Sequence, residues 1–470
     1  MLERIRSLFR YEDHWDVPLI VAFCIINLLV LANSIEHHPK IGYDSGSDLT
    51  YIQILSNRLP ASTEDTEFFT PPLPFFAPSL FNDVCNVVVP GPTTELYGLN
   101  VKWDCRFYDG KFAQFLNFLL SIGTVLLLLF ISDKIKPGNR YFKLSVLAFL
   151  SVLTVYYKTF SQVRPEPYLV FFAALSTYLL ILNLEDPVLV RRHVVLLGVS
   201  LGLLMLSRQW GIFVYVAIGL LMIWLFFQDR EQASHLFRPV LFSFLISVLI
   251  GGWFYLHLYL SEGSFTAFNI KAPGFSLSNL PPGFFRETEL RGGQLFRAPV
   301  RPNFDGQFFP MLYSDVWGDY WGYFTFYKRG LGLVDTSGQT VPFLGQVNLF
   351  AVIPSILLLA GAILGVIRLF RRTVPLTGEA TWLAFFSLMA ISSMVGFLWF
   401  IISYYSVSTA TLKATYVLQL FIALLFPAAA LLEKLRERSR LLYWVAISLL
   451  LIVLIHDWPA MITNYKDFLL

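Results

Sequence analysis

Two aspartates, Asp44 and Asp48, stand four residues apart in the stretch 42–51, directly after the first long apolar run. On a helix this spacing places both carboxylates on one face, at the level where a membrane meets water. A carboxylate there can act as a general base or bind a divalent cation such as Mg²⁺ or Mn²⁺, so this pair supplies the leading catalytic and metal-binding candidates. The structural alternative is a helix cap followed by a solvated acid, because Asp and Ser are favoured in a first helical turn.

Three basic residues are expected at the same membrane level as Asp44. Lys158 and Arg164 lie in one short segment between apolar runs, and Arg208 lies in the next such segment on the same side. Because arginine binds phosphate through paired hydrogen bonds, we predict that these residues hold the phosphate of a lipid carrier. The alternative is that each side chain only reaches from a helix end to the membrane surface.

Three further carboxylates are candidate substrate contacts. Glu166 follows Arg164 by two residues and either orients that arginine, contacts substrate or forms a simple salt bridge. Asp315 and Asp319, again four residues apart, lie in a loop rich in Trp and Tyr. They contact an acceptor in one interpretation and serve as caps and hydrogen-bond partners in the other.

The chain has three cysteines, of which Cys85 and Cys105 fall in one polar segment and Cys24 falls in the first apolar run. A bond between Cys85 and Cys105 would close a loop of about 20 residues and stabilise the fold by about 3 kcal/mol. We predict this disulfide, because the compartment expected for the segment permits it. The sequence contains no phosphate-cradling GxxxxGK[ST] loop, which argues against ATP-driven transport by this chain alone.

Composition indicates an all-α polytopic membrane protein. Hydrophobic residues make up 56% of the chain and charged residues 14%, whereas soluble domains carry about 25% charged residues. Membrane lipids are therefore expected partners, and nothing indicates nucleic acid. About eleven apolar segments are long enough, or nearly so, to cross a hydrocarbon core of about 30 Å. They cover residues 17–33, 112–131, 141–157, 167–184, 193–206, 211–227, 239–260, 346–367, 380–402, 414–432 and 441–457.

Basic residues predict the orientation. Most Lys and Arg fall in segments that share a side with the N-terminus, and only Lys158, Arg164, Arg208 and Lys413 occupy the short loops on the other side. The N-terminus is therefore predicted to be cytoplasmic. The absence of an Asn-x-Ser/Thr sequon favours a prokaryotic plasma membrane over the endoplasmic reticulum.

Two long segments, 34–111 and 261–345, are then predicted to lie on the outer face. Their aromatic content favours packing into a cap over the membrane rather than disorder. Within the first of them, the proline-rich stretch 68–76 is predicted to be a stiff, non-helical strap at the interface.

The order of these features resembles the GT-C superfamily of polytopic glycosyltransferases, in the branch related to protein O-mannosyltransferases and the lipid A aminoarabinose transferase. In that branch the first outer loop often opens with Asp-Glu-x-x-His-x-x-Tyr. Here Asp44 takes the first position, Ser45 and Asp48 replace Glu and His, and Tyr51 matches. The Pro-Pro-Leu-aromatic strap of the branch matches at residues 71–75.

Two basic motifs extend the resemblance, which covers about residues 1–260. Arg164-Pro165-Glu166 matches the Arg-x-Glu before the fourth span, and Arg208 matches the arginine after the fifth. The resemblance implies a seven-span catalytic module at 1–260, a second outer loop at 261–345 and a four-span C-terminal module at 346–470.

The function implied by the resemblance is transfer of a sugar from a polyprenyl-phosphate or polyprenyl-diphosphate carrier to a lipid, glycan or protein acceptor on the outer face, with inversion. In such a reaction Asp44 deprotonates or orients the acceptor, Arg164 and Arg208 hold the carrier phosphate, and Tyr51 joins the substrate contacts. A divalent cation held by Asp44 or Asp48 is an option and not a requirement.

Two other functions remain as alternatives. A flippase or transporter of a lipid-linked or polar substrate would place ionisable groups near the bilayer midplane, whereas the apolar runs here are almost free of charge. A polysaccharide polymerase or ligase usually depends on arginines and a histidine in a long outer loop. The second loop contains Arg286, Arg291, Arg297 and Arg301 but no histidine.

Overall fold

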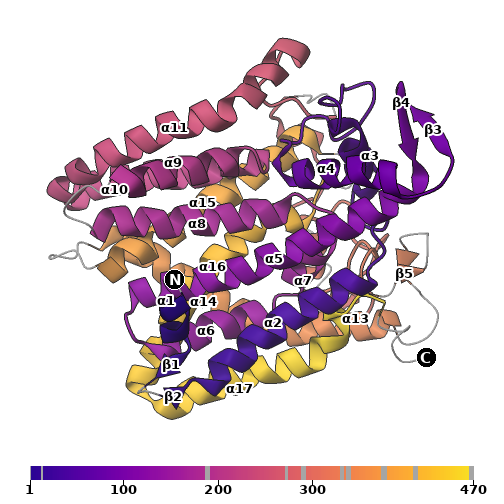
Figure 1. The fold of residues 1–470 in the computed structure, drawn as a ribbon. Helices are drawn as coiled ribbons and strands as arrows, with labels where there is room; N and C mark the ends of the chain where they lie inside the picture. The colour runs from indigo at the N-terminus through magenta and orange to yellow at the C-terminus, as the bar shows by residue number, and fades with distance from the viewer. Residues whose placement is uncertain are drawn as a thin grey trace.

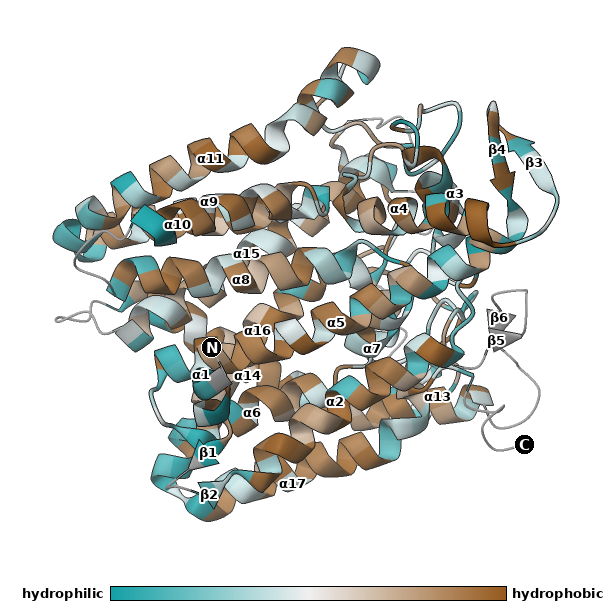
Figure 2. Ribbon diagram, in the orientation of Figure 1, coloured by the Kyte–Doolittle hydropathy of each residue, from teal (hydrophilic) through white to brown (hydrophobic). Residues whose placement is uncertain are grey.

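The computed structural model describes residues 2–11, 14–185, 191–269, 274–286, 293–325, 327–328, 333–334, 340–371, 378–405 and 411–464. Long helices run side by side across the molecule, and α3, α4 and the β3–β4 hairpin gather at its right-hand end in Figure 1. The described residues also form three two-stranded antiparallel sheets. Figure 2 shows apolar residues along the helices and more hydrophilic residues toward both ends of the bundle.

The first part of the chain, up to residue 262, contains the helices that surround the first outer loop. Its elements are α1 (Leu2–Leu8), β1 (Arg10–Tyr11), β2 (His14–Trp15), α2 (Val17–Glu36), α3 (Ser45–Leu55), α4 (Leu73–Val88), β3 (Thr93–Leu96), β4 (Leu99–Lys102), α5 (Trp103–Ile135), α6 (Arg140–Ser151), α7 (Thr154–Ser161), α8 (Glu166–Glu185), α9 (Arg191–Met205), η1 (Gln209–Gly211), α10 (Ile212–Gln228) and α11 (Arg230–Glu262).

The second part contains the other long loop and the last helices. Its elements are η2 (Leu277–Asn279), η3 (Gln294–Phe296), α12 (Phe308–Trp317), β5 (Tyr327–Lys328), β6 (Leu333–Val334), α13 (Thr340–Phe350), α14 (Val352–Phe370), α15 (Gly378–Tyr404), η4 (Ala414–Val417), α16 (Leu418–Arg438), α17 (Arg440–Asp457) and η5 (Trp458–Met461). The stretch Ala414–Arg438, which includes α16, is the most enclosed of the candidate spans. Of its most apolar 18 residues, 83% are buried inside the protein.

The chain is a multi-pass membrane protein. In its described part, 9 helical stretches are long and apolar enough to cross a membrane, and α6 with α7, bent by 69°, makes a tenth when counted as one span. The predicted apolar segments are mainly helical, and the segment 141–157 falls on the two helices α6 and α7. These 9 or 10 candidate spans agree with the predicted architecture of about eleven segments long enough, or nearly so, to cross a membrane, and α9, with 15 residues, is the segment that falls short.

Helices α9 and α10 fold back on each other instead of forming one broken helix. The Tyr215 hydroxyl donates a hydrogen bond of 2.6 Å to the Leu201 carbonyl. Near the turn, a Cβ on Gly211 would lie 3.0 Å from the Leu204 carbonyl oxygen. Tyr215 comes after Gly211 in the chain, whereas its partner Leu201 comes before Leu204. The two helices are therefore antiparallel. The turn places Arg208 at the end of the bundle that also holds α3 and α4.

The proline-rich stretch differs from its prediction. Helix α4 begins at Leu73, and Pro72 is its N-cap residue. Pro74 lies in the first turn of α4, where the missing amide proton of proline has no intrahelical partner to lose. The prediction of a non-helical strap was therefore wrong from residue 73 onward. The sequence analysis gave too much weight to the number of prolines and too little to their position.

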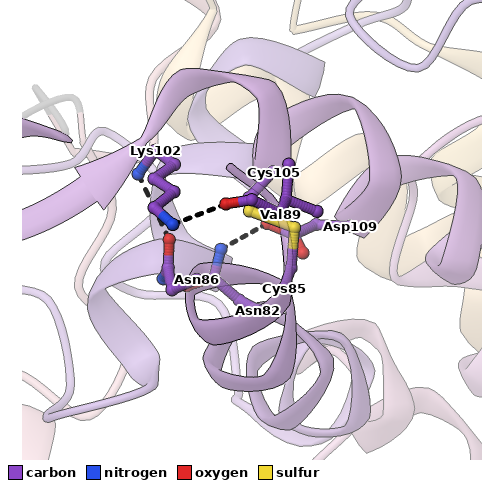
Figure 3. Close-up of a disulfide and its surroundings, with 7 residues drawn as sticks. All are labelled: Asn82, Cys85, Asn86, Val89, Lys102, Cys105 and Asp109. Atoms are coloured by element: carbon purple, nitrogen blue, oxygen red, sulfur yellow. Dashed lines mark hydrogen bonds between the residues drawn. A yellow bond between two sulfur atoms is a disulfide. The ribbon is translucent and has the colours of Figure 1, made fainter. Parts of the chain in front are cut away.

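The predicted disulfide joins Cys85 near the end of α4 to Cys105 in the first turn of α5. Figure 3 shows the surrounding contacts, in which Lys102 donates to the Val89 carbonyl at 2.5 Å. In the same view the Asn82 amide donates to Asp109 Oδ2 at 2.5 Å. Together these contacts fix the β3–β4 hairpin and α4 to the start of α5.

Candidate functional site

Asp44 immediately precedes helix α3 and has left-handed backbone angles, with a φ of 50°. This conformation is uncommon for a residue with a side chain, although Asp and Asn adopt it more readily than most. The carboxylate makes no capping hydrogen bond with α3. The structural alternative of a simple helix cap therefore does not describe Asp44, whose side chain turns to other partners.

Two cations contact the same oxygen of Asp44. Lys413 Nζ lies 2.6 Å from Oδ2, and Arg164 Nη1 lies 3.2 Å from it. Burial alone would raise the pKa of Asp44, but the positive charges of Lys413 and Arg164 outweigh burial and hold the pKa well below its usual value. Asp44 is consequently ionised at any physiological pH.

A chain of ion pairs leads from Asp44 into the protein. Arg164 forms a paired contact with Glu166, with Nε to Oε2 at 2.9 Å and Nη2 to Oε1 at 3.1 Å. Arg208 approaches Glu166 Oε1 at 3.4 Å and Glu67 Oε2 at 3.0 Å. Because each of these buried charges has an opposite charge beside it, the cluster avoids the large cost of isolated buried ions.

Asp48 differs from Asp44 in its surroundings. Its side chain lies in the first turn of α3 and is 1% exposed, and neither carboxylate oxygen has a hydrogen-bond partner among the described residues. Burial, followed by the nearby charge of Glu67, raises the pKa of Asp48 well above its ordinary value. The raised pKa favours the protonated form of Asp48 behind the ion-pair cluster, in which Asp44, Glu67 and Glu166 face three cations.

An open pocket adjoins this cluster and encloses about 450 Å³ of space not filled by atoms. Asp44, Arg208 and Lys413 bring charge to the pocket, whereas Arg164 and Glu166 lie behind its wall with side chains that are at most 1% exposed. The remaining wall is largely aromatic and is formed by Phe69, Trp210, Phe268, Phe400, Tyr404 and Tyr416, together with Glu67, Asn269 and Thr411. The arrangement offers two carboxylates, Asp44 and Glu67, and two cations, Arg208 and Lys413, to a ligand with polar and apolar parts.

Lys158, a predicted phosphate ligand, lies outside this pocket lining. Its Nζ donates to Asp315 Oδ1 at 2.9 Å and to the Asp315 carbonyl at 2.5 Å, and its side chain is 2% exposed. Asp315 also accepts hydrogen bonds from the Tyr43 hydroxyl at 2.7 Å and from the Ala414 amide at 2.7 Å. Asp315 thus connects Lys158, Tyr43 of the first long loop and Ala414 just before α16, next to the site.

Asp319 and Tyr51 also have structural partners. Asp319 accepts hydrogen bonds from the amides of Phe324 and Thr325 at 2.8 and 2.9 Å, as a turn-capping carboxylate does. The Tyr51 hydroxyl donates to the Thr70 carbonyl at 2.9 Å, and its fully buried ring packs against Phe75. These contacts correspond to the structural alternative considered for Asp319 and hold α3 against the residues before α4.

Sequence reasoning did not place Lys413, Glu67 or Tyr416 in the site. Lys413 is separated from Asp44 by 369 residues along the chain, and no spacing rule connects positions so distant. One signal was available, since Lys413 was one of few basic residues in the short loops on the side of Asp44. Glu67 and Tyr416 carried no comparable signal, because Glu67 lies in a long loop with several other carboxylates and Tyr416 lies at the start of a predicted span.

The arrangement does not fit a bound divalent cation. Among the described residues, no group of three or more His, Cys, Asp or Glu side chains is arranged to hold a metal ion. Two cations already contact Asp44 Oδ2, and burial raises the pKa of the Asp48 carboxyl. No step of the mechanism below therefore passes through a metal.

A family model links the sequence to enzymes of known type. Residues 70–261 match the family described as dolichyl-phosphate-mannose-protein mannosyltransferase. The chain resembles the GT-C glycosyltransferases of the protein O-mannosyltransferase branch. The resemblance inferred from the sequence is thereby confirmed. The matched region contains Arg164 and Arg208 but neither Asp44 nor Lys413. No protein of curated function matches the chain by sequence.

Solved structures extend the comparison to the fold. The oligosaccharyltransferase of Archaeoglobus fulgidus in its apo form is 12% identical, with a TM-score of 0.51, and the match covers 95% of this chain and 56% of that one. ArnT of Cupriavidus metallidurans bound to undecaprenyl phosphate is 14% identical, with a TM-score of 0.46, and the match covers 91% of this chain and 62% of that one. The S. cerevisiae Pmt1-Pmt2 complex bound to the sugar donor is 13% identical, with a TM-score of 0.36, and the match covers 56% and 36%.

These matches have a clear limit. The chain spans less than two thirds of the length of the ArnT, Pmt and oligosaccharyltransferase chains just named. Of the three structures, the archaeal enzyme alone has a TM-score above 0.5, and its low identity supports a shared fold and nothing finer.

Proposed function

We propose that the protein is a membrane glycosyltransferase that moves a sugar from a polyprenyl-phosphate or polyprenyl-diphosphate carrier to a lipid, glycan or protein acceptor. The observation that carries the proposal is the Asp44 carboxylate, held at an open pocket by Lys413 and Arg164 with Arg208 lining the same pocket. The family match to lipid-linked mannosyltransferases agrees with such a donor. Under this proposal the N-terminus is cytoplasmic, and the pocket opens to the outer face of a prokaryotic plasma membrane.

In the proposed reaction, Asp44 binds the acceptor hydroxyl and aligns its oxygen with the anomeric carbon of the sugar. The new bond forms between these atoms while the bond from the anomeric carbon to the carrier phosphate oxygen breaks. The acceptor proton passes to Asp44, and the bonding electrons leave with the phosphate. Attack from the side opposite the phosphate inverts the anomeric centre. The pocket thus supplies orientation and electrostatic stabilisation.

The low pKa of Asp44 makes it a weak base before the donor binds. A carrier phosphate that binds Arg208 and Lys413 draws the lysine charge away from Asp44. The pKa of Asp44 then rises toward its ordinary value, which makes the carboxylate a better proton acceptor when the donor is present. Lys413 therefore has two roles, one toward the carboxylate and one toward the phosphate.

The neutral form of Asp48 supports phosphate binding. With Asp48 uncharged, the carboxylates Asp44, Glu67 and Glu166 balance the cations Arg164, Arg208 and Lys413. An ionised Asp48 would add a negative charge behind the pocket and repel the phosphate. The aromatic wall offers ring faces to the apolar face of a sugar and to the first isoprene units of a carrier.

Sugar transfer by the purified protein tests this proposal. Radiolabelled polyprenyl-phosphate sugars and a membrane extract as acceptor source are offered to the wild type, to Asp44→Asn and to Asp83→Asn, which removes an exposed carboxylate on α4. Wild type and Asp83→Asn are expected to transfer sugar. Asp44→Asn is expected to lose activity by about 100-fold or more, the loss typical of an acid–base group, while keeping its elution profile.

Three results would contradict the proposal in different ways. Equal transfer by wild type and Asp44→Asn would remove Asp44 from the chemistry but leave the enzyme class intact. A wild type that transfers no sugar but moves the carrier lipid between leaflets of a liposome would establish the flippase instead. Release of long glycan products would favour the polymerase or ligase.

A further inference from the structure

A second group of basic residues lies at the end of the bundle opposite the Asp44 pocket. Helix α16 begins next to Tyr416 and Lys413 and reaches Lys434 after 16 more residues from Leu418, about 24 Å at 1.5 Å per residue. Arg368 is in the last turn of α14, and its Nη1 lies 3.8 Å from Oε1 of Glu379 in the first turn of α15. This end of the bundle takes no part in the proposed sugar transfer.

A groove between α14 and α16 ends at these basic residues. Its apolar wall is formed by Leu364, Gly365, Pro427, Ala430 and Leu431, with Arg368 and Lys434 as its polar members. The two helices nearly touch beside it, because a Cβ on Gly361 would lie 2.5 Å from the Ala428 Cα. The groove therefore has a fixed, narrow apolar floor and a cationic mouth.

The side of α14 that points away from the helix bundle contacts lipid. Ile363, Ile367 and Phe370 are exposed apolar side chains on the helix that forms one side of the groove. In a membrane-spanning helix such side chains contact acyl chains rather than water. The groove accordingly opens beside the hydrocarbon layer, where lipid molecules are its immediate neighbours.

Local charge is unbalanced at the mouth of the groove. Arg368 and Lys434 both line the groove, and Arg371 follows Arg368 by three residues. Glu379 and Glu433 also neutralise Lys136, at 3.2 and 2.7 Å. Within the described residues Lys434 makes no hydrogen bond or ion pair. The positive charges of Arg368, Arg371 and Lys434 therefore repel one another, and an anion bound between them would reduce that repulsion.

We propose that this groove binds an anionic phospholipid, with its phosphate between Arg368 and Lys434 and the start of an acyl chain along the groove. Basic pockets between transmembrane helices are a recurrent setting for phospholipid head groups. The bound lipid bridges α14 and α16, and α16 also begins beside the Asp44 pocket. The proposal is independent of the sugar-transfer proposal, because it uses none of the residues of that pocket.

Native mass spectrometry of the detergent-purified protein tests the proposal with two lipids of equal chain length, phosphatidylglycerol and phosphatidylcholine. Each neutralised side chain is worth about 1 kcal/mol, or about five-fold in affinity. Wild type is therefore expected to retain phosphatidylglycerol at least five-fold better than phosphatidylcholine. The double variant Arg368→Gln, Lys434→Gln is expected to lose this preference. A matched control, Arg191→Gln with Arg192→Gln, removes two exposed charges at the same end and is expected to keep it.

Thermal unfolding supplies a second readout. Phosphatidylglycerol is expected to raise the melting temperature of wild type and control but not of the groove variant. Inorganic phosphate alone is expected to have no such effect, because it lacks the acyl chain that fills the groove. The proposal is overturned by an unchanged preference in the groove variant, by an equal loss in the control, or by full stabilisation with inorganic phosphate.

Discussion

Lys413 Nζ lies 2.6 Å from Asp44 Oδ2, although the two residues are separated by 369 positions in the chain. The contact joins the segment before α16 to the residue before α3, and it determines the charge state of the carboxylate at the pocket. The two halves of the protein therefore meet at the residue proposed to carry the chemistry.

Replacing Lys413 by methionine is expected to weaken donor binding about ten-fold, since charge-assisted hydrogen bonds contribute about 1.5–3 kcal/mol. The pKa of Asp44 rises when the lysine charge is lost, so the acid limb of the kcat/KM profile should move to higher pH. Lys413→Arg should restore most of the binding. A methionine variant with an unchanged pH profile would show that Lys413 does not control Asp44.

Asp48→Asn is expected to retain sugar transfer within about three-fold, because an amide has nearly the same shape and charge as the neutral acid. Stability gives a sharper test. The folded-state pKa of Asp48 is raised above the unfolded value of 3.8, so the folded protein binds more protons and wild-type stability falls as pH rises above about 4. The melting temperature of Asp48→Asn should therefore exceed that of wild type by a margin that grows as the pH rises. Loss of transfer as large as that of Asp44→Asn would instead make Asp48 catalytic.

His37 is expected to make the protein acid-sensitive. The ring is fully buried, with Nδ1 2.7 Å from Thr463 Oγ1 and Nε2 2.8 Å from the Ile41 carbonyl oxygen. Burial is the main cause that lowers its pKa from 6.5 to about 4. The unfolded chain then binds the extra proton first, so stability falls as pH drops from about 6.5 toward 4, by about 2 kcal/mol at pH 5.

Melting temperatures at pH 8 and pH 5 check the role of His37. His37→Asn should lose less stability on acidification than wild type, even if it begins from a lower value. His38→Asn, which changes the exposed neighbouring histidine, should behave like wild type. Equal acid sensitivity in His37→Asn and wild type would assign the effect to other groups.

Removing the disulfide with Cys85→Ser and Cys105→Ser is expected to lower stability by about 3 kcal/mol, the value for a loop of this length. The sequence separation is 20 residues, and the bond fixes α4 to α5 beyond the pocket. Sugar transfer at low temperature should therefore persist in the double variant. A thermal shift assay with and without reductant should show a shift in wild type and none in the variant.

Much of the fold followed from local patterns. The predicted apolar runs are mainly helical, and the position of Arg208 after a separate short helix agreed with the two-pass interpretation of α9 and α10. Local rules misjudged the stretch beginning at Leu73, because proline in a first turn starts a helix as readily as it ends one. Hydropathy also does not report that α9 has 15 residues, fewer than a full span needs.

The candidate site was predictable only where its residues carried a motif. Asp44, Arg164 and Glu166 were identified from the sequence, and the structure brings them together with Arg208. Lys413 was not, because its contact depends on how α15 and α16 pack against the first helices. Lys158 lies at the end of the bundle that was expected for it, but its contact with Asp315 depends on the path of residues 261–345.

The separation of Asp44 from Lys413 also orders events during biosynthesis. Asp44, Arg164 and Arg208 leave the ribosome and enter the membrane well before Lys413, and the pocket wall from Phe400, Tyr404 and Tyr416 is equally late. A partly synthesised chain therefore holds the acidic residue without the lysine and without much of the aromatic wall. The pocket becomes complete only when the last third of the polypeptide has been inserted, so an unfinished chain cannot engage a donor through it.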